Sequence, residues 1–230
     1  MAIVITHSNP GGQMNLASHL ERWAAERPSH PAILFEGRRL SYADLDAAAS
    51  RLAHALRANG VSTGDRVALY LPNVPEFAIV FFAAQKLGAI TVSINAIFRA
   101  AEVEYLLNDS GAKAVFTVGE LAQFVPRERC PELAHVVVCE GEAPAGAASL
   151  ADWCAGRDAR FESVDCVADA PASLLYSSGT TGFPKGVTLT QSNISTNIAT
   201  AAKCSGYRAD DRLAVFLPLF HVYGQNYIMN

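Results

Sequence analysis

The spacing of apolar residues along the chain switches repeatedly between helical and strand-like periods. Apolar positions three and four apart predict helices over 15–26, 41–60, 73–87, 102–108 and 192–204. Short apolar runs bounded by turn residues predict strands over 32–35, 67–71, 90–94, 114–118, 135–139, 173–176, 187–189 and 213–216. Residues 140–149 are rich in Gly, Ala and Pro, which is typical of a surface loop.

Turn and capping residues fix several boundaries between these elements. Gly37 is expected to turn a β-hairpin between 32–35 and the residues that follow it. Residues 41–44 resemble a capping box, with Asp in the place usually taken by Glu or Gln. Asn73 and Pro75 are expected to open the apolar helix that ends at Gly88.

The predicted strands are apolar throughout and are separated by helices. A strand that is covered on both faces is apolar at every position, whereas a half-exposed strand alternates. The pattern therefore predicts an α/β fold, with a layered and largely parallel sheet flanked by helices on both sides. A chain of 230 residues that is 50% hydrophobic is long enough for one large domain or two small ones.

Composition removes several classes of function. A net charge of −4 and the lack of clustered Lys and Arg give no electrostatic basis for nucleic-acid binding. No apolar run approaches 18 residues, so no membrane span is expected. Five cysteines with no CxxC spacing favour reduced thiols in a cytoplasmic protein over disulfides or a zinc site, and no metal-binding residues are predicted.

Residues 177–185 carry the most concentrated chemistry in the chain, directly after a predicted strand. The segment combines hydroxyls, glycines that allow sharp turns, and one cation, namely Ser177, Ser178, Gly179, Thr180, Thr181, Gly182 and Lys185. Hydroxyls, exposed backbone N–H groups and a cation together suit a polyphosphate, whose oxygens each accept several hydrogen bonds. Open α/β folds place ligands at the carboxyl ends of their strands, where this segment is expected.

Three interpretations of this segment compete. It could be an ordinary Ser/Gly turn between two strands, because these residue types crowd many loops. A Walker-type P-loop would need Gly-Lys-Ser/Thr opening a helix, but Pro184 precedes Lys185 and a strand-like run follows Gly186. The third interpretation is a phosphate loop of another kind. The residues alone leave the first and third open.

Residues 174–187 are similar, position for position, to the signature of the AMP-forming synthetase and ligase superfamily, which includes acyl-CoA synthetases. Three other segments resemble boxes of that family in the same order, 40–45, 87–95 and 217–224. The resemblance covers nearly the whole chain from about Leu16. One departure is Gln191, at a position where family members often have His, and little change is expected from it.

The resemblance implies an ATP-dependent carboxylic acid:CoA ligase that uses ATP, Mg²⁺ and coenzyme A. The carboxylate of a fatty or aromatic acid would attack the α-phosphate, and a thiol would then displace AMP from the acyl-adenylate. Residues 177–182 and Lys185 would bind the ATP phosphates, and His221, Tyr223 and Gly224 would line the acyl pocket. From the residues alone, a lone His among aromatics such as His221 is more often structural.

The resemblance also implies that 1–230 is an incomplete N-terminal domain. About 1–170 would form a first α/β portion and 171–230 would hold the phosphate loop and the start of the acyl-pocket portion, without the family's C-terminal domain or its catalytic Lys. The chain alone is therefore expected to be inactive, and uncovered apolar surface is expected to drive homo-oligomerisation. The alternative is a non-catalytic binding or scaffold protein that keeps a partial adenylating fold.

Overall fold

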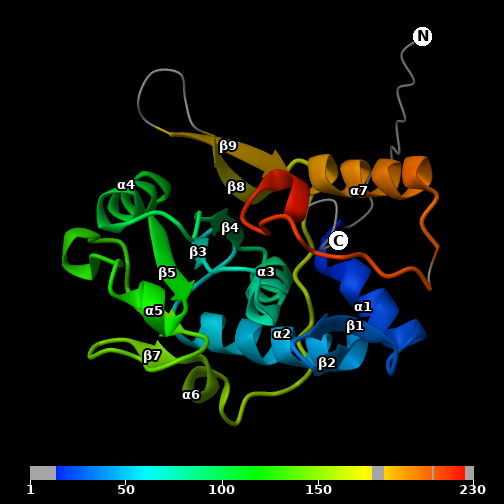
Figure 1. Ribbon diagram of the computed structural model, residues 1–230, viewed down its shortest axis with the longest axis horizontal. Helices are drawn as coiled ribbons and strands as arrows, with labels where there is room; N and C mark the ends of the chain where they lie inside the picture. Colours follow the sequence, from blue (N-terminus) through cyan, green and yellow to red (C-terminus); the bar gives the residue numbers. More distant parts are fainter. Residues whose placement is uncertain (1–13, 178–183, 209, 226–230) are drawn as a thin grey trace.

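A seven-stranded sheet forms the centre of the molecule (Figure 1). The computed structural model describes residues 14–177, 184–208 and 210–225. In spatial order the strands are β7 (Ala148–Ser149), β6 (His135–Val138), β5 (Ala112–Thr117), β3 (Arg66–Tyr70), β4 (Ile90–Ser93), β8 (Pro171–Ser177) and β9 (Lys185–Thr190). Each neighbouring pair is parallel except β8–β9, which is antiparallel. The predicted α/β class with a largely parallel sheet is confirmed.

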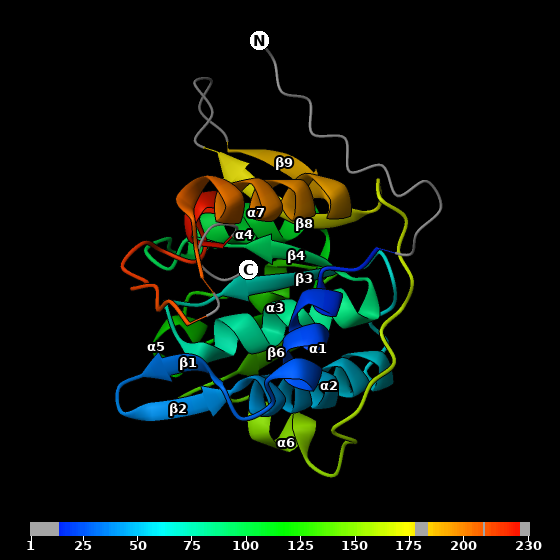
Figure 2. The same cartoon turned by 90° about the vertical axis from the view of Figure 1, so that its right-hand side faces the viewer.

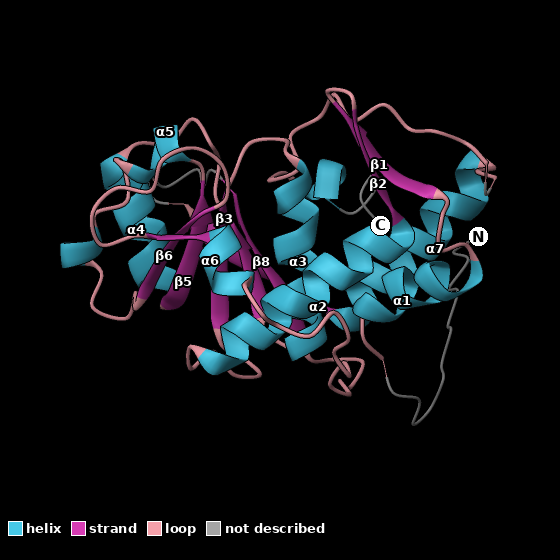
Figure 3. Cartoon of the chain, turned by 90° about the horizontal axis from the view of Figure 1, so that it is seen from below, coloured by secondary structure: helices cyan, strands magenta, loops and turns pink. Residues whose placement is uncertain are grey.

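Helices cover both faces of this sheet. The described helices are α1 (Ala17–Glu26), α2 (Tyr42–Ala58), α3 (Pro75–Leu87), α4 (Ala100–Ser110), α5 (Gly119–Ala122), α6 (Leu150–Cys154) and α7 (Gln191–Ser205), with a short 3₁₀ turn at Arg127–Arg129. Figure 3 shows α4 and α5 on one side of the sheet and α1, α2 and α3 on the other. The antiparallel hairpin of β1 (Pro31–Phe35) and β2 (Arg38–Ser41) lies outside the sheet, beside α2 (Figure 2).

The residues of β3 explain why both faces need a helical cover. Val67 and Leu69 belong to the apolar cluster that includes α2 and α3. Ala68 and Tyr70 point the other way and belong to the cluster that includes α4. Successive side chains of a strand alternate between the two faces of a sheet, so the apolar run 67–70 must be buried on both faces.

Helix α3 is buried along its whole length, including its charged residues. Lys86 is buried, and its Nζ lies 2.6 Å from Glu21 Oε1 and 2.9 Å from Asp46 Oδ1. A buried ammonium without such partners would be very costly, so these carboxylates on α1 and α2 let the helix carry a lysine in the core. The ion pairs also tie three helices together.

Most of the predicted elements are confirmed with small shifts in their ends. The capping box of Ser41 and Asp44 is present at the start of α2. Gly88 ends α3 with a φ of 69°, a conformation that glycine adopts without a steric penalty. Asn73 does not cap α3, however, because the N-cap is Val74 and it makes no side-chain capping bond.

Two stretches differ from the prediction. The predicted loop 140–149 ends in the short strand β7, and α6 follows it. The predicted strand 213–216 is wrong, since these residues form no strand and Phe216 is 80% exposed. A strand needs a neighbour that takes its backbone hydrogen bonds, and no described strand lies beside this segment.

The division of the chain near residue 170 stays a prediction. Strand β8, which begins at Pro171, pairs with β4 inside the same sheet as the earlier strands. All five cysteines are free thiols. In the described ranges, every helix is too short or too polar to cross a lipid bilayer.

Candidate functional site

The β8–β9 hairpin brings two of the predicted phosphate-binding residues face to face. Ser177 and Lys185 are register partners at the end of the hairpin where the connecting loop begins and ends, and both are exposed. Ser177 is the last residue of β8. Because β8 runs parallel to β4, Ser177 lies at the edge of the sheet where the parallel strands end, and such sheets bind ligands at this edge. The other predicted phosphate-binding residues, Ser178, Gly179, Thr180, Thr181 and Gly182, lie outside the described residues.

Helix α4 contacts both sides of this hairpin near its loop end. The hydroxyl of Tyr176 donates a hydrogen bond of 2.6 Å to Asp109 Oδ2, and the hydroxyl of Tyr105 donates one of 3.1 Å to the carbonyl oxygen of Pro184. Burial, together with the hydrogen bond to Asp109 and the charge of its carboxylate, holds the pKa of the Tyr176 hydroxyl above its usual range. The Tyr176 hydroxyl therefore keeps its proton, and its hydrogen bond to Asp109, to a more alkaline pH than an ordinary tyrosine would.

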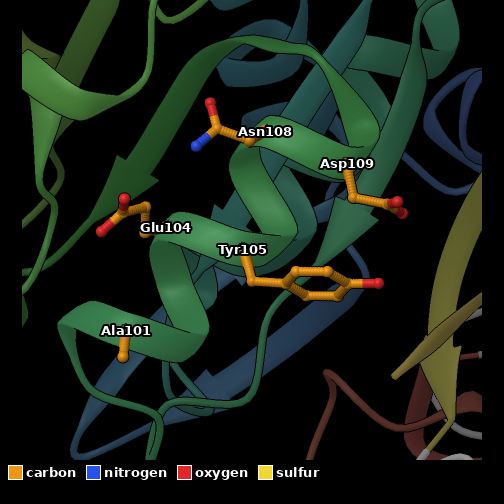
Figure 4. Close-up of a pocket in the computed structure, with 5 residues that line it drawn as sticks. All are labelled: Ala101, Glu104, Tyr105, Asn108 and Asp109. Carbon is orange, nitrogen blue, oxygen red and sulfur yellow. The ribbon is translucent and has the colours of Figure 1, made fainter. Parts of the chain in front are cut away.

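A shallow hollow of about 520 Å³ lies on this part of α4. Its lining residues are drawn in Figure 4 and are Ala101, Glu104, Tyr105, Asn108 and Asp109. Glu104 is paired with Arg129 at 2.9 Å, and Asp109 accepts the hydroxyl of Tyr176. The side chains of Tyr105 and Asp109 point to the same side of the helix in this view, so one face of α4 contacts the loop end of the hairpin.

The aromatic turn, defined as residues 217–225, lies against the same edge of the sheet. Asn73, three residues after β3, donates from Nδ2 to the carbonyl oxygen of Leu217 at 2.9 Å. Its Oδ1 accepts from the backbone N–H of Leu219 at 2.8 Å. Figure 1 shows this turn in red, beside β8 and α7. A segment far along the chain is thereby fastened to the carboxyl end of β3.

The three predicted acyl-pocket residues occupy different environments in this turn. His221 is exposed, and its Nδ1 accepts a hydrogen bond of 3.3 Å from the backbone N–H of Tyr223. Gly224 is buried, and a Cβ atom there would stand 2.2 Å from the carbonyl oxygen of Pro218. That distance excludes any side chain at this position, so Gly224 is required for the turn to close.

Tyr223 lines a second hollow, of about 370 Å³, between the turn and α7. The described residues around it are Asn197, Thr200, Ala201, Cys204, Val222 and Tyr223. The structure therefore brings Tyr223 to a hollow at this edge of the fold, whereas His221 is not among its lining residues. An apolar ring, a small apolar side chain and several polar groups would accept a ligand with both an apolar and a polar part.

Gln225, the last residue of the turn, bonds to two strands of the sheet. Its Oε1 accepts a hydrogen bond of 2.9 Å from Ser93 Oγ on β4, and its Nε2 donates one of 3.1 Å to Ser173 Oγ on β8. Thr91 Oγ1 also lies 3.1 Å from Ser173 Oγ. The turn is thus linked through Gln225 to the strand that ends at Ser177.

Gln191, the departure from the family pattern, lies in a second buried amide network. Its Oε1 accepts from the backbone N–H of Leu16 at 2.9 Å, and its Nε2 donates to Gln85 Oε1 at 3.0 Å. Gln85 in turn donates to the carbonyl oxygen of Ala172 at 3.0 Å. The role of Gln191 is therefore to join α7, α1 and α3 in the core.

Sequence reasoning missed the residues that hold this site, chiefly Asn73, Gln225, Tyr105 and Asp109. Asn73 gave a usable signal, because a polar residue just past a buried strand sits at the ligand-binding edge. Nothing in the local pattern distinguishes Gln225 or Asp109 from other polar residues. Within the described ranges, no three His, Cys, Asp or Glu side chains come together as a group that could hold a metal ion.

Comparison with known proteins finds a family that matches most of the chain. Residues 20–230 match the model of the AMP-binding enzyme family. The chain is 39% identical, over 184 residues, to the long-chain-fatty-acid–CoA ligase FadD13 of Mycobacterium tuberculosis. This match covers 80% of this chain and 36% of that protein. It is 33% identical to 4-coumarate–CoA ligase 2 of Solanum tuberosum, covering 82% of this chain and 35% of that protein.

Among solved structures, the chain is similar to the anthranilate CoA ligase AuaEII in complex with anthranoyl-AMP. The TM-score is 0.90 at 28% sequence identity, and the match covers 94% of this chain and 44% of that one. The chain thus spans less than half the length of these relatives and corresponds to their N-terminal portion.

Proposed function

The chain belongs to the AMP-binding enzyme family, and we propose that it is the ATP-phosphate-binding part of an ATP-dependent carboxylic acid:CoA ligase. The observation that carries this proposal is the β8–β9 hairpin, which presents Ser177 and Lys185 as partners at the carboxyl edge of the sheet. One hydroxyl and one exposed ammonium at the same end of the hairpin suit the oxygens of a polyphosphate. The predicted hydroxyls and glycines between them extend the same chemistry.

In the proposed reaction, a carboxylate oxygen of the acid bonds to the α-phosphorus of ATP. The bond between this phosphorus and the oxygen that bridges to the β-phosphate breaks. Pyrophosphate leaves with the electron pair of that bond, which increases the negative charge on its oxygens. Donors at Ser177 and Lys185 would stabilise this charge as it grows. The thiol of coenzyme A would then attack the acyl carbon, and AMP would leave as the thioester forms.

The aromatic turn is the proposed binding site of the carboxylic acid. Tyr223 lines the hollow against α7, and Gly224 allows the turn to fold tightly behind it. His221 is exposed on the same turn and offers an imidazole to a carboxylate. An apolar wall with polar groups nearby suits the fatty or aromatic acids that the relatives' names mention.

Mg²⁺ is proposed as a partner of the ATP phosphates, which would supply oxygen ligands together with water. The described residues include no cluster of acidic side chains at the hairpin that would bind the ion by themselves. A cytoplasmic location belongs to the same proposal, because five free cysteines suit a reducing compartment. Self-association also stays a prediction, and exposed apolar side chains such as Val215 and Phe216 support it.

The proposal is tested by titrating ATP into the purified chain by calorimetry, with Lys185→Ala as the variant. Hydrogen bonds to charged groups contribute about 1.5–3 kcal/mol, so we expect the variant to bind ATP at least tenfold more weakly. Lys203→Ala is the matched control, because Lys203 is also an exposed lysine but lies on α7. Its affinity for ATP should equal that of the wild type.

Equal affinities for the wild type and Lys185→Ala would contradict the proposed phosphate site. A wild-type chain that binds no ATP would favour the scaffold alternative. The same samples, incubated with ATP and an acid, should release no acid-dependent pyrophosphate, since the relatives are more than twice as long as this chain.

A further inference from the structure

Two amide side chains join the aromatic turn to the sheet, one at each end of the turn. We propose that Asn73 and Gln225 are positioning residues that set where the turn holds a carboxylic acid. This inference rests on the proposed function, because it concerns the same acid-binding turn. The contacts that support it lie among described residues at 73, 93, 173 and 217–225.

Asn73 binds its end of the turn as a neighbouring strand would. One amide group both donates to Leu217 and accepts from Leu219, at 2.9 and 2.8 Å. These bonds span 144 and 146 positions in the sequence, so they fix the turn against β3 and do not shape it locally. Residues 213–216 pair with no described strand. The bonds of Asn73 therefore hold the turn in a defined position although the residues just before it belong to no sheet.

Gln225 binds the other end from inside the fold. Its side chain is fully buried, and both ends of the amide are used, with Ser93 on β4 and Ser173 on β8 as partners. A buried amide stabilises a fold only when its donor and acceptor are both satisfied, which occurs in very few placements of the turn. Gln225 therefore specifies one position of the turn on the sheet.

Other contacts of the turn have a different role. The backbone bonds from His221 to Pro218 and from Gln225 to His221 close the turn on itself. The buried side chain of Leu219 adds apolar contact, which is not directional. The two amides supply direction, and they lie on either side of Tyr223 and His221. A shift of the turn by a fraction of a hydrogen-bond length would move both of these side chains.

The consequence is a selective effect on ligands. The turn is proposed to bind the acid, whereas Ser177 and Lys185 on the hairpin are proposed to bind the ATP phosphates. Loss of an amide should therefore weaken acid binding much more than ATP binding. A residue with only a structural role would lower stability and affect both ligands alike.

The test compares Asn73→Ala and Gln225→Leu with two matched variants, Asn15→Ala and Gln85→Leu. Asn15 also uses one amide to join distant backbone groups, and Gln85 is also a buried amide with both ends bonded. Backbone hydrogen exchange is measured over 217–225 in each 230-residue variant. Affinities are measured for ATP and for two probe acids, dodecanoate and benzoate.

We expect exchange over 217–225 to speed up at least tenfold in Asn73→Ala and Gln225→Leu, in line with the loss of buried hydrogen bonds, and to stay unchanged in the matched variants. Affinity for whichever probe acid the wild type binds should fall at least tenfold, with ATP affinity within about twofold. Asn73→Asp keeps the acceptor for Leu219 but replaces the donor to Leu217 with a carboxylate oxygen, which repels that carbonyl oxygen, so its effect should be at least as large.

Unchanged exchange in the turn, or the same change in the matched variants, would overturn the inference. An equal loss of ATP and acid affinity would overturn it too, because that result indicates a structural role alone. If the wild-type chain binds neither ATP nor an acid, the proposed function fails and the inference about acid placement fails with it. The exchange data then still decide whether the two amides hold the turn.

Discussion

The helix-covered strands and the ligand edge of this protein are held in place by different forces. The helix-covered strands, β3 and β5, carry side chains that are almost all buried among apolar neighbours. The ligand edge, defined as the β8–β9 hairpin and the aromatic turn 217–225, has an exposed outer strand and an exposed His221. Besides the pairing of β8 with β4, it contacts the rest of the fold through side-chain hydrogen bonds of Asn73, Gln225, Tyr105 and Tyr176.

This difference has a physical origin. Apolar burial is strong but not directional, so it can hold a strand firmly without specifying the position of one atom. A hydrogen bond contributes less free energy, yet it weakens steeply when its distance or angle changes. The proposed site would have to place a carboxylate beside a phosphate, which requires direction more than stability. The ligand edge accordingly uses polar side chains for several of its long-range contacts.

The largest effect on stability should come from the core. Phe81 on α3 is fully buried and meets Phe82 edge-on at 5.4 Å between ring centroids. Phe81→Ala should lower the free energy of unfolding by about 3–5 kcal/mol, because it removes buried apolar area and leaves a cavity. Urea denaturation followed by circular dichroism measures this loss.

Phe216→Ala is the matched variant for this comparison. The same side chain at position 216 is 80% exposed, so its removal should change the free energy of unfolding by no more than about 0.5 kcal/mol. Similar losses at the two positions would mean that 213–216 is covered in solution. Self-association through this segment would be the first explanation to examine, by light scattering across protein concentrations.

A smaller effect is expected at Gln191, which lies where the ligand edge meets the core. Gln191→Leu leaves the Leu16 N–H and Gln85 Oε1 without this buried partner and should cost about 1–3 kcal/mol of stability. Gln191→His should cost less, because a neutral imidazole has one donor and one acceptor and can replace both bonds. Urea denaturation of both variants measures the difference.

Gln123→Leu serves as the control, since Gln123 is exposed and bonds only locally to the carbonyl oxygen of Glu120. It should lie within about 0.5 kcal/mol of the wild type. A histidine variant that is as unstable as the leucine variant would show that the amide shape matters beyond its hydrogen bonds. The departure from the family pattern would then have a specific packing cause.

The two regions also differ in how well the sequence predicts them. The strand over 67–71 and the helix ending at Gly88 follow from apolar spacing and a glycine, because burial leaves a periodic trace in the sequence. The hairpin and its Ser177 and Lys185 follow from the motif and the flanking strands. The residues and the family resemblance together predict these features.

The remaining features depend on contacts between distant residues. The prediction of a strand over 213–216 was wrong because apolar spacing does not reveal whether a partner strand is present. Asn73 was expected to open α3, yet its amide bonds to a segment more than 140 positions away. Such a pairing leaves no local pattern, since it depends on how β3, β4 and β8 are ordered in the sheet.

The most direct test of the contrast between the two regions is hydrogen exchange over the whole chain, measured with and without ATP. If the ligand edge binds the nucleotide, ATP should slow exchange in β9, over 185–190, and leave β3 and β5 unchanged. Protection spread evenly over β3, β5 and β9, or no ATP-dependent change in any described segment, would contradict the assignment of the nucleotide site to this edge.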